Sequence, residues 1–233
     1  AGIVGMVVLG FLNAFGIEVE TKTLANTESP LILYGLLIGL CLILLATSFY
    51  LHIQKKEKYH FKLLLKLSGR LPSDFVEMTN LATVTFNMSI MGFILLGYVL
   101  INGGQLNGPI VGSIIGAMSF GAFGNQVKNT VPVLVGIMIG CYLTGVDVAS
   151  TSALVAAIFG TTLAPVSGYY GPLAGVIAGF VHITLVSHVV VMHGGLNLYN
   201  NGFAVGFVAA VLVPIFEIFE GIRQDIKERK AEG

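Results

Sequence analysis

The stretch from Pro30 to Leu51 constrains this chain more than any other, because none of its 22 residues carries a charge. An α-helix needs about 20 consecutive apolar residues to cross the hydrocarbon core of a bilayer. The stretch therefore predicts a transmembrane helix, and with it an integral membrane protein.

The composition of the whole chain agrees with this prediction. Of 233 residues, 55% are apolar and 10% are charged, whereas roughly 25% of the residues in an ordinary soluble domain are charged. Twelve basic and twelve acidic residues are too few to cover a soluble surface, so lipid must cover much of the exterior. The net charge of zero excludes the broad basic field that binds nucleic acid. We therefore expect the lipid bilayer, and no nucleic acid, among the partners.

Two basic clusters predict how the chain is oriented. Residues 52–72 follow the first span and carry six basic side chains, and the tail at 220–233 carries four more. Because lysine and arginine mark cytoplasmic connections, both clusters are predicted to be cytoplasmic. The leucines between the lysines of 52–72 fit a short helix on the membrane surface, and a solvated loop fits equally well.

Six apolar segments lie between the two clusters, and an even number of crossings keeps both clusters on one side. They cover about 75–101, 108–120, 131–143, 149–164, 172–192 and 203–219. Since 131–143 and 149–164 are short for complete spans, four crossings with two re-entrant pieces satisfy the same parity. The predicted fold is all-α, a polytopic transmembrane helical bundle with short broken or re-entrant helices in one membrane domain, 1–233.

The first residues predict that the chain is a fragment of a longer protein. Ala1 already lies in an apolar stretch that ends near Phe15, without an initiator methionine or a basic leader. We expect the parent protein to be a homo-oligomer in a bacterial inner membrane.

An internal repeat is the most informative pattern in the chain. Residues 108–116 and 171–179 both have the pattern GPxxGxxxG, at an offset of 63 residues. Glycines four apart share one helix face and let another helix approach closely in lipid, and the proline fits a first helical turn. We therefore expect each motif to begin a tightly packed helix. Residues 82–144 and 145–219 are the predicted repeats, although shared helix-packing patterns give the same glycines without a repeat.

An amide-rich NxxxN cluster follows each GPxxGxxxG helix. Asparagine and glutamine both donate and accept hydrogen bonds, so such clusters at helix breaks can replace the hydration shell of a polar solute. Lys128 lies just ahead of a helix expected near Val131, where charge and helix dipole would favour a neutral polar or anionic solute over a metal cation. A solvated loop is the alternative. The predicted solute-binding residues are Asn125, Gln126, Lys128 and Asn129 in the first cluster, and His193, Asn197, Asn200 and Asn201 in the second.

A second group of polar residues is predicted inside the bundle. Glu77, Asn80 and Asn87 fall along one face if 75–101 is a single helix, and polar groups in a span face the interior or a water-filled path. Ser73 or Asp74 is expected to cap that helix. His182, in the helix of the second motif, is a candidate proton carrier. Glu77 at a helix end in the headgroup region and His182 as a packing residue are the alternatives.

Signatures of enzymes, metals and cofactors are missing from the sequence. There is no GxSxG, GxxxxGK[ST] or HExxH pattern, and the histidines have no metal-ligand spacing. Cys41 and Cys141 lie in apolar runs and are expected to pack. Ser150 to Ser152 and Thr161 to Thr162 are expected to cap or bond helix backbones. We therefore expect no catalytic or metal site and no cofactor.

The run HGGLNLYNNGFA at 193–204, with the preceding GPLAG helix, resembles a family of bacterial polytopic membrane proteins of unknown function. The resemblance implies that the chain covers about the C-terminal half of such a protein, and it brings no substrate. The short helices interrupted by Gly and Pro are similar in architecture to urea-transporter-like channels, but no motif of those channels carries over to a residue here.

These patterns favour a transporter or channel for a small neutral polar or anionic solute, with a path lined by Asn and Gln at helix breaks. Two other classes stay open. A structural or assembly subunit predicts no continuous polar path, and an intramembrane enzyme predicts a closed polar pocket around Glu77 and the histidines.

Overall fold

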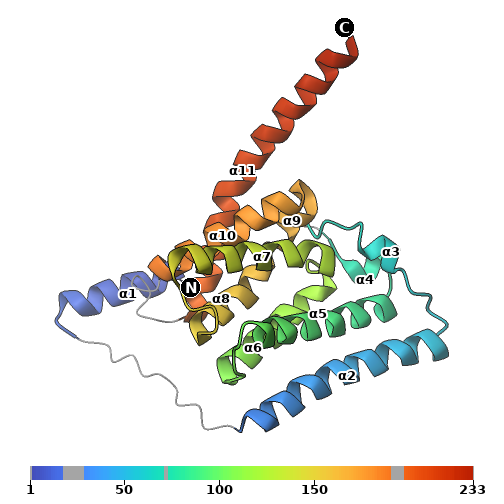
Figure 1. Ribbon diagram of the computed structural model, residues 1–233, viewed down its shortest axis with the longest axis horizontal. Coiled ribbons are helices and arrows are strands. Elements are labelled where there is room, and N and C mark those ends of the chain that lie inside the picture. Colours follow the sequence, from blue (N-terminus) through green and yellow to red (C-terminus); the bar gives the residue numbers. More distant parts are fainter. Residues whose placement is uncertain (1, 18–28, 71–72, 190–196, 233) are drawn as a thin grey trace.

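The computed structural model describes residues 2–17, 29–70, 73–189 and 197–232 (Figure 1). Within these ranges the protein is all-helical, 81% helix without strands, which confirms the predicted class. The α-helices are α1 (Gly2–Ala14), α2 (Pro30–Gln54), α3 (Phe61–Leu64), α4 (Phe75–Met78), α5 (Leu81–Ile101), α6 (Gly108–Ser119), α7 (Val127–Thr144), α8 (Thr151–Gly160), α9 (Ala164–Tyr170), α10 (Pro172–Val189) and α11 (Asn197–Glu232), and the 3-10 helices are η1 (Phe120–Ala122) and η2 (Thr161–Leu163).

Six helical segments of the described chain are long and apolar enough to cross a membrane. They are Pro30–Gln54, Leu81–Ile101, Val127–Thr144, Thr151–Tyr170, Pro172–Val189 and Asn200–Gln224, and the shorter apolar Gly108–Ala122 lies among them. The first contains the predicted span 30–51. Many of its large apolar side chains are exposed, including Leu31 at 80%, and lipid is the medium in which such a surface is stable. The protein is an integral membrane protein.

The bundle has two ends, which hydrogen bonds between the loops define. At the basic end, the connection 52–70 contacts the start of α5, where Asn80 Nδ2 donates to Lys58 O at 2.6 Å. The same connection contacts the C-terminal part of α11, where Arg70 Nη2 donates to Glu217 Oε1 at 3.0 Å. At the far end, Asn107 Nδ2 ahead of α6 donates to Thr151 Oγ1 at the start of α8, at 2.8 Å. Six consecutive passes run between these ends in alternating directions: α5, α6, α7, the α8 to α9 segment, α10 and α11. Both basic clusters therefore begin at the same end of the bundle.

Helices α7 and α10 form a parallel pair whose backbones nearly touch. A Cβ on Gly136 of α7 would overlap Val176 O, and a Cβ on Gly179 of α10 would overlap Val133 O. Gly140 lies one turn further along α7, and a Cβ on it would overlap the side chain of Ile183, one turn after Gly179 on α10. The second GPxxGxxxG motif therefore packs as predicted, against a second GxxxG pair on α7.

The first GPxxGxxxG motif differs from the prediction. It begins α6 as expected, with Pro109 in the first turn and Asn107 accepting from Ile110 N at 3.0 Å. A Cβ on Gly108 or Gly112, however, would meet no atom within 4 Å. The glycine face of α6 is thus open in the described structure, because the helix packs through its other side, around Ile110 and Ile114.

Helix α7 begins earlier than predicted, at Val127 instead of near Val131, and Pro132 lies inside it. The reason is a reciprocal cap, in which Gln126 Oε1 accepts from Lys128 N at 2.7 Å and Asn129 Oδ1 accepts from Gln126 N at 2.8 Å. This cap satisfies the first N–H groups and starts the helix ahead of the proline. Lys128 is therefore in the first turn and not ahead of the helix.

The predicted helix over 75–101 is two helices. Asp74 caps α4 as expected, with its Oδ1 accepting from Val76 N at 2.8 Å. Thr79 then leaves helical geometry, and Asn80 caps α5 by accepting from Thr83 N at 2.9 Å. Glu77 is consequently not on the same helix face as Asn80 and Asn87, which corrects that prediction.

The segment predicted over 149–164 is a broken helix that extends to Tyr170. Ser150 caps α8 by accepting from Ala153 N at 3.3 Å, as expected. The 3-10 helix η2 then interrupts the segment, and the hydroxyls of Thr161 and Thr162 donate to Ile158 O and Phe159 O. A 3-10 stretch inside a helical span is a common position for a hinge.

Helix α11 is longer than the predicted 203–219, because the tail continues it to Glu232. Its C-terminal part extends away from the bundle (Figure 1). The predicted surface helix in 52–72 is short, four residues at Phe61–Leu64, and the residues after it contact the ends of the bundle helices.

Candidate functional site

The first amide cluster is buried and bonded to backbone groups. Besides the cap of α7, Asn129 Nδ2 donates to Ser68 O at 3.2 Å and to Gly124 O at 2.8 Å. Gln126 Nε2 approaches Leu65 O and Leu67 O at 3.5 and 3.4 Å. Both side chains are 1% exposed. The solvated-loop alternative does not hold for these two amides, which tie the connection to the start of α7.

Two glycines allow this close approach of the connection. A Cβ on Gly69 would overlap Gly124 O, and a Cβ on Gly168 of α9 would overlap Ser68 O. Gly69 also has a φ of +77°, which favours glycine. The connection therefore runs between α7 and α9 instead of lying free on the surface.

We expect Asn129→Ala to lower the free energy of unfolding by about 1–3 kcal/mol, because the change leaves buried backbone groups without partners. The measurement is the thermal unfolding midpoint of the purified chain in detergent. Asn102→Ala is the control, since Asn102 is half-buried and makes one side-chain bond, to Tyr98 O at 2.7 Å. A variant that melts like the wild type but has lost solute flux would reverse this assignment and make Asn129 a solute contact.

Asn125 and Asn87 form a deeper polar group beside the break in the α8 to α9 segment. Asn87 Nδ2 donates to Gly121 O and to Asn125 O, both at 2.8 Å. Asn125 Nδ2 donates to Thr161 Oγ1 at 3.1 Å. Asn125 Oδ1 is buried without a hydrogen-bond partner in the described residues. The first cluster thus reaches the middle of the α8 to α9 segment through Asn125.

The second amide cluster reaches the same segment through His182. Asn200 and Asn201, in the first turns of α11, are 0% and 2% exposed. The Asn201 side chain lies beside the His182 imidazole, whose Nε2 is 3.0 Å from Ala156 O. A Cβ on Gly160 would come within 2.8 Å of the His182 ring, so this glycine makes room for the imidazole.

Four of the predicted site residues are placed elsewhere or are not fully described. Glu77 is exposed on α4, away from the span, and Asn80 is a helix cap at the basic end. His193 lies outside the described residues, and for Asn197 only the backbone at the start of α11 is described.

Two larger cavities lie between the α8 to α9 segment and α11. The far-end cavity, about 320 Å³, is lined by residues of α8, α10 and the loop before α8, and by Asn201 of α11. The basic-end cavity, about 330 Å³, is lined by η2, α9 and the connection, and by Val205, Ala209 and Val213 of α11. Since 201, 205, 209 and 213 are four apart, both cavities lie along one i, i+4 ridge of α11.

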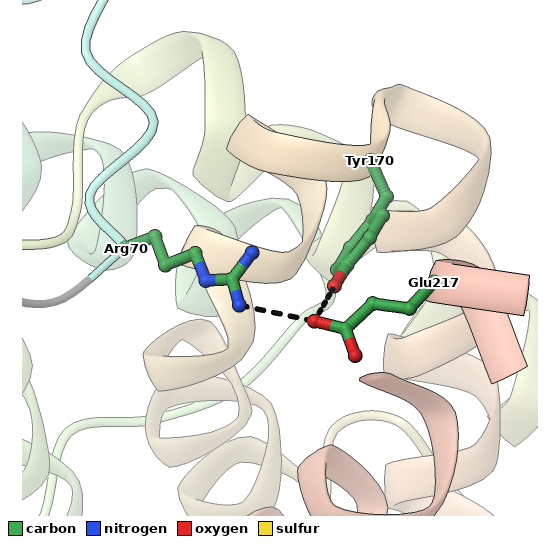
Figure 2. Close-up of polar contacts among 3 residues, drawn as sticks. All are labelled: Arg70, Tyr170 and Glu217. Atoms are coloured by element: carbon green, nitrogen blue, oxygen red, sulfur yellow. Dashed lines mark hydrogen bonds and ion pairs between the residues drawn. The ribbon is translucent and has the colours of Figure 1, made fainter. Parts of the chain in front are cut away.

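Figure 2 shows a polar network of Arg70, Tyr170 and Glu217, and the first two of these residues also line the basic-end cavity. Arg70 Nη2 and Tyr170 Oη both donate to Glu217 Oε1, at 3.0 and 3.3 Å. The Arg70 guanidinium also lies 4.4 Å from the centre of the Tyr169 ring, a cation–π distance. Sequence reasoning missed this network. Glu217 had a signal, because it is the only charged residue in the predicted apolar segment 203–219.

A sequence model of one protein family, described as a protein of unknown function, DUF1576, matches residues 52–218. The chain belongs to the DUF1576 family. This confirms the resemblance to a family of unknown function. No curated protein and no solved structure matches the chain.

The DUF1576 match includes both amide clusters, the two cavities and Arg70 with Glu217, and it leaves out α1 and most of α2. The candidate site of this DUF1576 protein is therefore the region between α11 and the α8 to α9 segment. The two cavities lie there, and Asn125 of the first amide cluster, Asn201 of the second and His182 lie beside it.

Proposed function

We propose that this DUF1576 protein is a transporter or channel that passes a small neutral polar or anionic solute along α11. The observation that carries the proposal is the pair of cavities at opposite ends of the bundle, on one ridge of one helix. A solute path along α11 requires space near both ends of the bundle, and a purely structural subunit has no need of it.

The polar groups between the cavities support a solute path. Asn125 bonds Thr161, and Asn201 lies beside His182, which contacts Ala156. Thr161 and Ala156 are five residues apart on the same segment, so both amide clusters approach it at a similar depth. Buried polar and ionisable groups within a span are costly, and they commonly mark solute or proton pathways.

The order of the helices also supports transport. Pass by pass, α5 runs opposite to the α8 to α9 segment, α6 opposite to α10 and α7 opposite to α11, and the two GPxxGxxxG helices begin at opposite ends. Two halves of opposite orientation, with broken helices at the solute site, are a recurrent plan of secondary transporters. In this proposal η2 is the hinge, and the network of Arg70, Tyr170 and Glu217 closes the basic end.

The lining residues indicate the class of solute. Ser152, Ser187 and Asn201 line the far-end cavity, and Arg70 lines the basic-end cavity. These groups offer hydroxyls, an amide and a guanidinium, which is paired with Glu217 in the structure, while neither cavity has a carboxylate among its described lining residues. Such a lining suits neutral polar or anionic solutes and not metal cations.

Cysteine labelling tests the path without knowledge of the solute. Val205, Ala209 and Val213 are each replaced by cysteine in a chain whose buried Cys41 and Cys141 are alanine, and a membrane-impermeant thiol reagent is added. Because these ridge positions line a cavity that water can fill, we expect each to react at least tenfold faster than cysteines at positions of α11 that line no cavity.

Phe207 and Val211 give matched controls, since they are on the same helix, are 50% and 43% exposed, and line neither cavity. Cysteines there should face lipid, where the thiolate does not form, and react slowly. If the ridge cysteines react no faster than these two, no aqueous path follows α11 and the transport proposal falls in favour of a structural subunit.

A further inference from the structure

The basic-end cavity has a mostly apolar wall with a small polar edge. Its apolar lining residues are Leu163, Pro165, Val166, Val205, Ala209 and Val213. Arg70 and Tyr170 line it as well, and both are donors of the network in Figure 2. Its volume of about 330 Å³ lies within the range of small-molecule sites, about 300–1,000 Å³, which are mostly apolar with a few polar groups. The cavity therefore has the form of a site for a small molecule with one polar end.

The donors at this edge meet at one carboxylate oxygen. Arg70 Nη2 and Tyr170 Oη both donate to Glu217 Oε1, at 3.0 and 3.3 Å (Figure 2). Glu217 follows Val213 by four residues, so it continues the ridge of α11 that lines the cavity, although it is not itself a lining residue. The protein thus shows, with its own side chain, that a carboxylate is a group that this pair of donors binds.

Arg70 is held at the cavity by contacts that do not involve Glu217. Its backbone N–H donates to Ser68 Oγ at 3.2 Å, and its carbonyl oxygen accepts from Ser73 Oγ at 2.5 Å. The guanidinium lies 4.4 Å from the centre of the Tyr169 ring, which is a cation–π distance. The donor therefore stays at the cavity when the ion pair opens.

Glu217 is an easily displaced partner. The side chains of Arg70 and Glu217 are 44% and 51% exposed, and ion pairs of such exposure contribute little to stability. Only one of the three guanidinium nitrogens, Nη2, has a hydrogen bond in the described part of the chain, whereas a guanidinium binds a carboxylate best through two parallel bonds. A second carboxylate that makes both bonds can therefore replace Glu217.

We propose that the basic-end cavity binds a small monocarboxylate, with its carboxylate on Arg70 and Tyr170 in place of Glu217 and a short apolar chain against α9 and α11. The inference rests on the proposed function, because it names the class of solute on the same path. Glu217 is then a built-in competitor that occupies the donors until the solute arrives. A neutral solute lacks the charge to replace it, and chloride lacks both the second oxygen and the apolar chain.

The test measures binding to the full chain purified in an uncharged detergent. Sodium butyrate, sodium formate, sodium chloride and the neutral analogue butyramide are titrated at equal ionic strength, and the thermal unfolding midpoint reports the affinity. We expect saturable stabilisation by butyrate. Formate should bind at least about tenfold more weakly, because each buried methylene strengthens binding about fourfold. Butyramide and chloride should not stabilise the chain.

Glu217→Gln should tighten butyrate binding, by about tenfold, because it removes the competing charge and keeps the length of the side chain. Arg70→Gln should weaken binding at least about tenfold, and Tyr170→Phe several-fold, because each removes a hydrogen bond to a charged group. Glu220→Gln is the matched control, since Glu220 is on the same helix and outside the network of Figure 2. This variant should bind butyrate as the wild type does.

Three results would overturn the proposal: no tighter binding in Glu217→Gln, undiminished binding in Arg70→Gln, or equal stabilisation by butyrate and butyramide. Each would leave the ion pair as a structural contact only. The outcome is separate from that of the proposed function, because binding is measured without flux. Butyrate binding with the expected variant pattern but without flux in proteoliposomes would keep the carboxylate site and reject transport. Flux without butyrate binding would reject the carboxylate site alone.

Discussion

Gly136→Ala is expected to prevent the chain from reaching its folded state, or to leave it far less stable than the wild type. The added methyl group would overlap Val176 O on α10. A backbone oxygen cannot move aside by changing rotamer, so the two helices must separate along their whole contact. Overpacking of this kind typically costs about 1–3 kcal/mol, and a contact with backbone belongs at the upper end of that range or above it. Gly179→Ala, which meets Val133 O, should behave in the same way.

The measurement is the yield of monodisperse protein in detergent and its unfolding midpoint. Gly112→Ala is the matched control, because it is also a GxxxG glycine in a membrane helix but has no atom within 4 Å of the added Cβ. Replacing a helical glycine by alanine in open space stabilises a helix by roughly 0.5–1 kcal/mol. Equal stabilities for Gly136→Ala and Gly112→Ala would contradict the close parallel packing of α7 and α10.

Ala209→Phe is expected to abolish solute flux with little loss of stability. Ala209 lines the basic-end cavity and is half-buried, so a phenyl ring can enter the space without displacing the core. In the proposed path, filling the cavity removes the room through which a solute would reach Arg70 and Glu217. We expect permeation to fall at least tenfold, to the rate of liposomes without protein.

Flux is followed by light scattering of proteoliposomes after osmotic steps with urea, glycerol, sodium formate or sodium chloride. Ala210→Phe is the control, because Ala210 is the next residue on α11, is exposed and lines neither cavity. Wild-type rates in Ala209→Phe would remove this cavity from the path. Wild-type rates equal to empty liposomes for all four solutes would reject transport of solutes of this size.

Helix positions could be predicted from sequence because membrane insertion depends on local composition. The span at Pro30 to Leu51 is contained in α2, and each of the six later apolar segments contains a helix within its described residues. The predicted helix boundaries were wrong where a side-chain cap started a helix at a position that the hydrophobic pattern did not indicate. Pro132 suggested a helix start at 131, but the reciprocal cap of Gln126 and Asn129 begins α7 at Val127. Asn80 likewise starts a new helix and separates Glu77 from Asn87.

The candidate site was predicted in part. Asn125, Asn201 and His182 are at the region of interest, whereas Gln126 and Asn129 are used in the cap and in bonds to the connection. The two α11 cavities had no signal in the sequence. A cavity is a property of several helices at once, so no window of sequence contains it.

By itself, the sequence determined that this protein lies in a membrane, that it is helical, and where most of the helices lie. The reason is that each apolar residue contributes its own favourable free energy of transfer into lipid, largely independently of its neighbours. The tertiary structure decided which glycine faces meet, which amides are bonded to backbone and which residues surround the cavities. Those outcomes depend on contacts such as Gly136 with Val176 or Arg70 with Glu217. Such contacts join residues that are far apart in the chain. They form only when two or more helices pack together, so the sequence of one helix does not predict them.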